Sequence, residues 1–268
     1  MTFDTLKDFL RSHLLPTSYL DDAQHWFASM ISELAMHSTG AKTPSLVGLN
    51  GCQAAGKSTL ADYMRTVFKL NHGLNVAVLS LDDFYFTLQE RKRLAGDIYP
   101  LLQTRGLPGT DDIALALETI RGLQHLPAAG LYIPRFDKAA DDRVLKDKWE
   151  YLTEQPDIIL SEGWSLGSKA VDASELITAI NFLEREHDQD GLWRQYVNLQ
   201  LATSYPRLFE KIQLLIMLKA PSFNCVYQWR LEQEEKLRAK FQGLLTKGNK
   251  LMQKYRTNKR PVGSRFSH

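Results

Sequence analysis

The sequence has little of what secreted and membrane proteins contain. Its 268 residues include only two cysteines, Cys52 and Cys225, which is too few for a disulfide framework. No apolar run approaches the roughly 18 residues that a membrane-spanning helix needs. The first ten residues carry acidic side chains where a signal peptide would have an apolar stretch. We therefore expect a cytoplasmic protein with no membrane partner.

Acidic residues are absent from one part of the chain, which makes the charge distribution uneven. The segment from Lys236 to His268 contains ten Lys or Arg and no Asp or Glu, which leaves 23 basic against 31 acidic side chains elsewhere. This segment is either a solvated helix face with a tail, or a surface that binds nucleotide phosphates or another polyanion. It has no recognisable nucleic-acid motif, so the sequence does not favour a nucleic-acid partner.

Residues 45–59 carry the clearest functional pattern, Ser-Leu-Val-Gly-Leu-Asn-Gly-Cys-Gln-Ala-Ala-Gly-Lys-Ser-Thr. Gly51, Gly56, Lys57 and Ser58 match the phosphate-loop pattern G-x-x-x-x-G-K-[ST]. A short apolar run precedes the loop, and apolar residues at helical spacing follow it, as the motif requires. We weigh this against a chance match in a tight turn and predict that the loop binds a nucleoside triphosphate. The expected binding residues are Gly51, Cys52, Gln53, Ala54, Ala55, Gly56, Lys57, Ser58 and Thr59.

The chemistry of such a loop follows from its place between a strand and a helix. The two glycines allow backbone angles that turn successive N–H groups toward an anion, and the positive end of the helix dipole adds to the attraction. Lys57 can reach the terminal phosphates, and the Ser58 hydroxyl can bind Mg²⁺.

Alternating strands and helices predict an α/β fold with a parallel sheet of the P-loop NTPase type, flanked by helices. Buried strands are expected at 46–49, 76–81, 158–160 and 213–218. We treat residues 1–268 as a single domain with three additions: N-terminal helices at 1–40, a lid helix at 222–245 and a basic segment at 246–268. Within 165–212 we expect further helices, with Leu176, Ile180 and Leu183 on one stripe, and a charged loop at 184–191.

Acidic residues follow two of the expected strands. Asp82 and Asp83 come after the second, and Glu162 comes after the third. Ligands of parallel sheets bind at the carboxyl ends of the strands. Carboxylates there can hold Mg²⁺ directly or through water, and one can take the proton from an attacking hydroxyl. The alternative is that these acids only cap helices.

A long loop-rich stretch at 104–143 lies between these strands and is typical of a functional region. Its Arg105, Arg135 and Arg143 could hold a carboxylate or phosphate, although a single Arg is often only part of a surface ion pair. After the fourth strand, Arg230 lies on a charged helix where a lid would stabilise a transferred phosphoryl group. A solvated helix with internal ion pairs is an equal alternative for that segment.

Several segments together resemble the D-glycerate 3-kinases of the plant and fungal type and their bacterial relatives. These segments are the phosphate loop, Leu-Ser-Leu-Asp-Asp-Phe-Tyr, Thr-Arg-Gly-Leu-Pro-Gly-Thr-Asp-Asp, Ile-Pro-Arg-Phe-Asp-Lys and Leu-Ser-Glu-Gly-Trp. The wider superfamily includes phosphoribulokinase, uridine kinase and pantothenate kinase. The resemblance covers roughly residues 45–240, and it leaves the N-terminal helices and the basic C-terminal segment unassigned.

The resemblance implies a role for each matching residue. Asp82 would activate the acceptor hydroxyl, and Glu162 would join Ser58 and Asp82 at the Mg²⁺ site. Acceptor contacts would come from Asp83, Tyr85, Arg105, Asp137 and Arg143. Lys57 and Arg230 would act on the transferred phosphate. The preference for ATP over GTP rests on the resemblance alone, since no base-recognition motif is readable.

We expect an ATP-dependent small-molecule kinase, with D-glycerate giving 3-phosphoglycerate as the first choice of reaction. Another acceptor, such as a nucleoside or pantothenate, is the alternative among enzymes. A non-catalytic ATP-bound switch, acting on a partner through the basic segment, is the alternative from another class.

Overall fold

A four-stranded parallel sheet forms the centre of the protein. The computed structural model describes residues 2–245, so the basic segment expected at 246–268 lies outside the described residues. The strands lie in the order β2 (Val76–Ser80), β7 (Ile158–Gly163), β1 (Ser45–Gly51) and β8 (Leu214–Leu218). All three neighbouring pairs are parallel. The predicted α/β fold is confirmed.

The register of the sheet brings its functional residues to one edge. Leu49 of β1 lies opposite Glu162 of β7, and Ser80 at the end of β2 lies opposite the same Glu162. Since all the strands run in one direction, the segments that follow β1 and β2 leave the sheet beside the end of β7. These segments are the phosphate loop and the Asp82–Asp83 pair.

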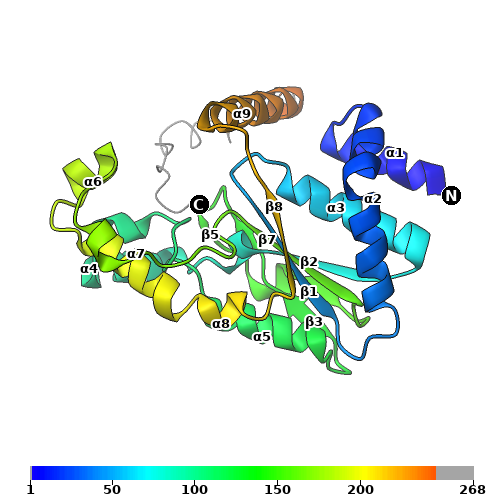
Figure 1. Ribbon diagram of the computed structural model, residues 1–268, viewed down its shortest axis with the longest axis horizontal. Helices are drawn as coiled ribbons and strands as arrows, with labels where there is room; N and C mark the ends of the chain where they lie inside the picture. Colours follow the sequence, from blue (N-terminus) through cyan, green and yellow to red (C-terminus); the bar gives the residue numbers. More distant parts are fainter. Residues whose placement is uncertain (1, 246–268) are drawn as a thin grey trace.

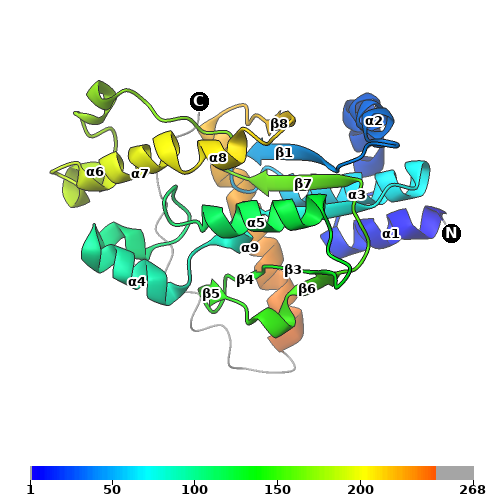
Figure 2. The same ribbon diagram turned by 90° about the horizontal axis from the view of Figure 1, so that it is seen from below.

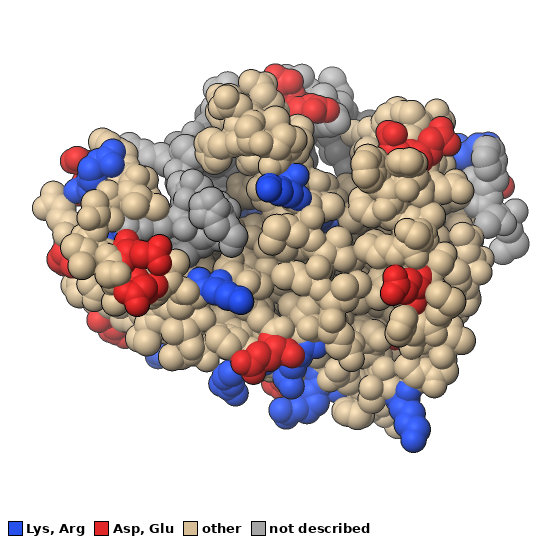
Figure 3. Space-filling model, viewed as in Figure 1, with Lys and Arg blue, Asp and Glu red and all other residues tan. Residues whose placement is uncertain are grey.

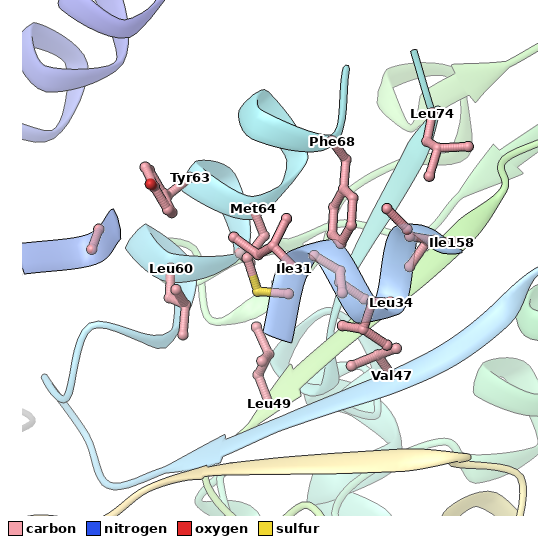
Figure 4. Packing of buried hydrophobic residues seen from close by; sticks show 14 of the residues in the cluster. Ile31, Leu34, Val47, Leu49, Leu60, Tyr63, Met64, Phe68, Leu74 and Ile158 are labelled. Atoms are coloured by element: carbon pink, nitrogen blue, oxygen red, sulfur yellow. The ribbon is translucent and has the colours of Figure 1, made fainter. Parts of the chain in front are cut away.

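Three helices cover one face of the sheet: α1 (Thr2–His13), α2 (Ser18–Ser38) and α3 (Lys57–His72). Figure 4 shows side chains of α3, including Met64 and Phe68, among Ile31 of α2 and Val47 of β1. Burial of each such side chain stabilises the fold by about 1.5–3 kcal/mol. The N-terminal helices therefore share a core with the helix that follows the phosphate loop.

The other face of the sheet packs against α5 (Ile113–Gln124), α7 (Leu192–Thr203) and α8 (Pro206–Phe209). Successive strand residues alternate between the faces: Leu46 and Ile159 point to this core, whereas Val47 and Ile158 point to the first one. In both Figure 1 and Figure 2, α1 and α2 lie at one end of the molecule. The opposite end holds α4 (Leu88–Asp97), α6 (Phe182–His187) and α7.

The connection between β2 and β7 is long and contains two small antiparallel sheets. After the 3₁₀ turn η1 (Leu81–Phe84) come α4, the turn η2 (Pro100–Gln103) and α5. The small sheets pair β3 (Leu131–Ile133) with β6 (Glu150–Leu152), and β4 (Phe136–Asp137) with β5 (Asp142–Arg143). A 3₁₀ turn, η3 (Lys146–Lys148), separates β5 from β6. The loop-rich stretch expected at 104–143 thus contains paired strands.

Among the strand boundaries that differ from the prediction, two concern the acidic residues of the site. The second strand ends at Ser80, so Leu81, Asp82 and Asp83 belong to η1. The third strand runs to Gly163, which places Glu162 inside β7 instead of after it. The apolar run ends at Leu160, so the sequence did not predict this extension. Ser161 and Glu162 are polar, although both are buried.

The single apolar stripe predicted for Leu176, Ile180 and Leu183 is wrong. Leu176 lies in the 3₁₀ turn η4 (Ala173–Leu176), Ile180 lies outside any helix and Leu183 lies in α6. The charged loop predicted at 184–191 is also wrong in part, because α6 extends to His187 and two of the acids are buried. One of them, Asp188, is paired with Arg194 at 2.9 Å.

The strand β8 leads into the long helix α9 (Phe223–Leu245), so the region expected to act as a lid is helical (Figure 1). None of the helices formed by residues 2–245 has the length and apolar character needed to cross a bilayer.

Candidate functional site

The phosphate loop lies between β1 and α3, as the sequence predicts. Gly51 ends β1, and Lys57, Ser58 and Thr59 begin α3. The turn between them consists of Cys52, Gln53, Ala54, Ala55 and Gly56. Ala54 and Gly56 both have left-handed backbones, with φ of 64° and 86°. Alternation of left- and right-handed residues turns successive N–H groups toward one point, which forms a concave site for an anion.

The first turn of α3 adds its own donors to this loop. Gly56 is the residue before the helix, and no side chain caps its N–H groups. Such uncapped donors and the helix dipole favour a bound phosphate. Gly51 does not have the left-handed backbone that was expected of both glycines, and it is needed for a different reason: a Cβ there would lie 3.0 Å from Leu218 Cβ and 3.3 Å from Lys57 Cγ.

The Lys57 side chain folds back over the loop. Its Nζ donates a hydrogen bond to the carbonyl of Cys52 at 3.0 Å. Burial lowers the pKa of Lys57, while the carboxylates of Glu162 and Asp82 act in the opposite direction. The partly buried Lys57 ammonium is suited to bind the terminal phosphates of a nucleotide.

Ser58 and Glu162 meet across the end of the sheet. The Ser58 hydroxyl donates to Glu162 Oε1 at 2.9 Å, and Glu162 is buried. A hydroxyl and a carboxylate oxygen are ligands that suit Mg²⁺. Among residues 2–245 there is no cluster of three or more His, Cys, Asp or Glu placed to hold a metal ion. The donors present therefore fit Mg²⁺ only together with phosphate oxygens and water, which is how Mg²⁺ is usually bound beside nucleotides.

Asp82 lies on η1 and is held by Lys138 and Tyr85. Its Oδ2 accepts from Lys138 Nζ at 2.5 Å, and its Oδ1 accepts from the Tyr85 hydroxyl at 2.6 Å. Burial alone would raise the pKa of Asp82, but the charge and hydrogen bond of Lys138, with help from Tyr85 and Lys57, hold it below its ordinary value. Asp82 is thus a carboxylate and can accept a hydrogen bond or a proton.

The neighbouring Asp83 faces a different environment. Its carboxylate accepts from Arg135 and from the backbone N–H of Phe136, both at 3.1 Å. Burial raises the pKa of Asp83, against the charge of Arg135. Neither Asp82 nor Asp83 caps a helix, so the capping alternative is wrong for this pair.

The other residues predicted to contact the acceptor are engaged with the protein itself. Tyr85 is buried. Arg105 pairs with Asp141, and Asp137 accepts from the N–H groups of Ala139 and Ala140. Arg143 donates to the carbonyl of Tyr85 at 2.9 Å and has a longer contact with Asp112.

Arg230 is not brought to this cluster. Among the described residues, the Arg230 guanidinium contacts Gln233 Oε1 and Glu234 Oε1 of its own helix α9, both at 2.8 Å. Figure 3 shows the charged side chains of the described residues scattered over one face, without a single dense basic patch on that face.

Three residues of the site region were not predicted. Lys138 pairs with Asp82, and Trp164 Nε1 donates to the carbonyl of Gly106 at 2.9 Å. The buried Asp111 accepts from the Tyr205 hydroxyl, and burial raises the pKa of Asp111 to about 8. A sequence signal existed for all three, because Lys138, Trp164 and Asp111 belong to the segments that carry the resemblance.

Comparisons with known proteins identify related kinases. No family model matches the chain. An uncharacterized kinase, mug58, of Schizosaccharomyces pombe is 32% identical over 204 residues, which cover 74% of this chain and 72% of that protein. The chloroplastic D-glycerate 3-kinase of Arabidopsis thaliana is 30% identical over 77% of this chain, and the match covers 45% of its own length.

The chain belongs to the same family of kinases as mug58, and it is similar to the D-glycerate 3-kinases.

The solved structure of D-glycerate 3-kinase from Cryptococcus neoformans has the same fold, with a TM-score of 0.67. It is 24% identical and the match covers 81% of this chain and 80% of that one. As a member of this family, the protein is an ATP-dependent phosphotransferase that acts on an alcohol group of a small molecule.

Proposed function

We propose that the protein transfers the γ-phosphate of ATP to the primary hydroxyl of D-glycerate, giving 3-phosphoglycerate and ADP. The observation that carries the proposal is the Asp82 carboxylate, which follows β2 at the same end of the sheet as the phosphate loop and pairs with Lys138. The name of the Arabidopsis relative supports D-glycerate as the acceptor.

In this proposal the triphosphate lies on Gly51–Thr59. The N–H groups of the loop and of the first turn of α3 surround the β- and γ-phosphates. Lys57 exchanges the carbonyl of Cys52, its partner at 3.0 Å, for a phosphate oxygen, which is the stronger, charge-assisted bond.

The residues that would hold Mg²⁺ are Ser58, Glu162 and Asp82, directly or through water. When bound there, the ion would neutralise charge on the phosphates. The Ser58–Glu162 hydrogen bond of 2.9 Å supports this assignment, since it places both oxygens side by side at the start of α3.

The acceptor approaches the γ-phosphate in line, with its hydroxyl against Asp82. The hydroxyl oxygen forms a bond to phosphorus as the bond from phosphorus to the β-phosphate oxygen breaks, and Asp82 takes the hydroxyl proton. Asp83, Tyr85, Arg105, Asp137 and Arg143 shape the acceptor pocket, and Arg230 approaches the transferred phosphoryl if α9 closes as a lid. Positioning and charge stabilisation supply most of the rate enhancement.

ADP release by the purified protein with Mg·ATP tests the proposal, using D-glycerate, L-glycerate, uridine and pantothenate as acceptors. We expect strong stimulation by D-glycerate alone. Stimulation by uridine or pantothenate instead would assign another acceptor. ATP binding without stimulation by any of them would favour the switch hypothesis.

The metal assignment has its own test. Ser58→Ala removes one oxygen ligand and should raise the Mg²⁺ concentration needed for half-maximal activity, whereas Ser45→Ala, at the far end of β1, should not. An unchanged Mg²⁺ requirement in Ser58→Ala would contradict the assignment.

A further inference from the structure

The turn between β4 and β5, residues 138–141, is held at both ends by hydrogen bonds and ion pairs. Asp137 Oδ1 accepts from the N–H groups of Ala139 and Ala140 at 2.8 and 3.1 Å. This Asx-type arrangement fixes the start of the turn. At its end, Asp141 has a left-handed backbone with φ of 57°, which a residue other than glycine adopts at some cost.

Two arginines hold Asp141 in that conformation. Arg91 is fully buried and donates to both the carboxylate and the carbonyl of Asp141, the latter at 2.6 Å. Arg105 pairs with the same carboxylate. The two guanidinium groups also lie within 6 Å of the Phe136 ring, at 5.9 and 5.6 Å from its centre. Such a set of charge-assisted bonds leaves the turn little freedom.

This turn carries Lys138, whose side chain extends to the site. Its ammonium reaches Asp82 Oδ2 at 2.5 Å, while 58% of its side chain remains exposed. The charge of Lys57, at the start of α3, also acts on Asp82. Lys138 comes from a different element and has no partner in the phosphate loop among the described contacts. Because more than half of the Lys138 side chain is exposed, solvent screens its pair with Asp82, and the ammonium can exchange this partner for another.

We propose that Lys138 binds the carboxylate of the acceptor, and that it rests on Asp82 until the acceptor arrives. This inference rests on the proposed function, because it needs an acceptor that carries a carboxylate. The incoming carboxylate replaces Asp82 as the partner of the ammonium, so no charge is left unpaired. Asp82 Oδ2 is then free to receive the proton of the acceptor hydroxyl.

This exchange lets Lys138 select acceptors that carry a negative charge over acceptors that do not. An acceptor without a negative charge offers Lys138 no replacement for Asp82, so the ion pair persists and Asp82 stays occupied. A charge-assisted hydrogen bond lost in this way should weaken acceptor binding about tenfold to hundredfold. The phosphate loop does not contribute to this step, so ATP binding should be unaffected.

Steady-state kinetics of the full-length protein with Lys138→Met and Lys138→Arg test the inference. Lys148→Met is the matched control, because Lys148 is an exposed lysine on η3, close in the chain. The acceptors are D-glycerate and its methyl ester, which keeps the hydroxyls and lacks the charge. The KM for ATP is measured in parallel, and thermal unfolding checks that each variant is folded.

We expect Lys138→Met to raise the KM for D-glycerate about tenfold or more, to leave the KM for ATP within about threefold of the wild type, and to lose most of the preference for D-glycerate over the ester. Lys138→Arg should recover part of the lost affinity, and Lys148→Met should behave as the wild type.

An unchanged KM for D-glycerate in Lys138→Met, or a rise in the KM for ATP in its place, would overturn the role of Lys138 while leaving the proposed function intact. A wild-type protein that does not turn over D-glycerate would overturn the proposed function, and the acceptor assigned to Lys138 with it.

Discussion

Replacement of Asp82 by Asn should lower kcat strongly while changing the stability of the fold only a little. The amide keeps the size of the side chain and can still accept from the Tyr85 hydroxyl, which lies 2.6 Å from Oδ1 in the native protein. It cannot accept a proton from the acceptor. Loss of a general base lowers kcat about 10²- to 10⁴-fold, which corresponds to about 3–5 kcal/mol in the barrier at 1.36 kcal/mol per tenfold.

The free energy of unfolding should fall by much less than the activation barrier rises. The lost partner, Lys138, is more than half exposed, and exposed ion pairs contribute about 0–1 kcal/mol. The KM for ATP should change little, because the loop N–H groups and Lys57 hold the phosphates. Rapid-quench measurement of ADP formation with saturating ATP and D-glycerate gives kcat, and urea unfolding gives the stability.

Asp83→Asn is the matched control, since it makes the same change one residue away. Asp83 accepts from Arg135 and from the backbone of Phe136, so its loss should cost about 1–2 kcal/mol of stability. Its effect on kcat should be much smaller than that of Asp82→Asn. If Asp82→Asn retains more than about a tenth of wild-type kcat while ATP still binds, Asp82 is not the base.

Three further predictions concern the loop, the core and a buried acid. Gly51→Ala would bring a Cβ to 3.0 Å from Leu218 Cβ and 3.3 Å from Lys57 Cγ, so the KM for ATP should rise about tenfold or more; an unchanged KM would show that the loop tolerates the methyl group. Ile31→Ala in α2, at 2% exposure, should cost about 2–5 kcal/mol in urea unfolding with kcat unchanged, and a change in kcat would contradict a purely structural role. The pKa of Asp111, about 8 because of burial, lies above the unfolded value of about 3.9, so its contribution to stability is complete below about pH 4 and is lost as the pH rises to about 8. Asn cannot ionise, so the Tm of Asp111→Asn relative to the wild type should increase from pH 5 to pH 8, and a constant difference would refute the shifted pKa.

Local patterns in the sequence predicted most of the sheet. The strands β1 and β8 are short apolar runs, and the loop after β1 matches a motif whose physical role depends on a preceding strand and a following helix. The error in β7 arose because Glu162 is both a strand residue and a polar residue of the site, and polarity alone suggested that the strand had ended.

The arrangement of the site could be predicted only in part. Asp82, Ser58 and Glu162 come together because strand ends meet, which follows from topology. Lys138 could not be predicted in the same way, since its partner is 56 residues away in the chain and the contact depends on a turn held by Arg91 and Arg105.

Buried polar pairs were the least predictable feature. The pair of Asp188 and Arg194 lies in a segment whose composition suggested a solvated loop. Its burial is stabilised by hydrogen bonds from the N–H groups of Trp193 and Arg194 to Asp188 at the start of α7, which charge composition alone does not reveal. The roles of Arg230 and of the other predicted acceptor residues stay predictions.

Identification of the product is the most direct test of the central claim. The purified protein is incubated with Mg·ATP and D-glycerate, and the ADP formed is compared with the phosphoglycerate formed, whose phosphate position is determined by phosphorus NMR. We expect one 3-phosphoglycerate for each ADP. ADP accompanied only by inorganic phosphate, or phosphate carried on the C2 hydroxyl, would contradict it.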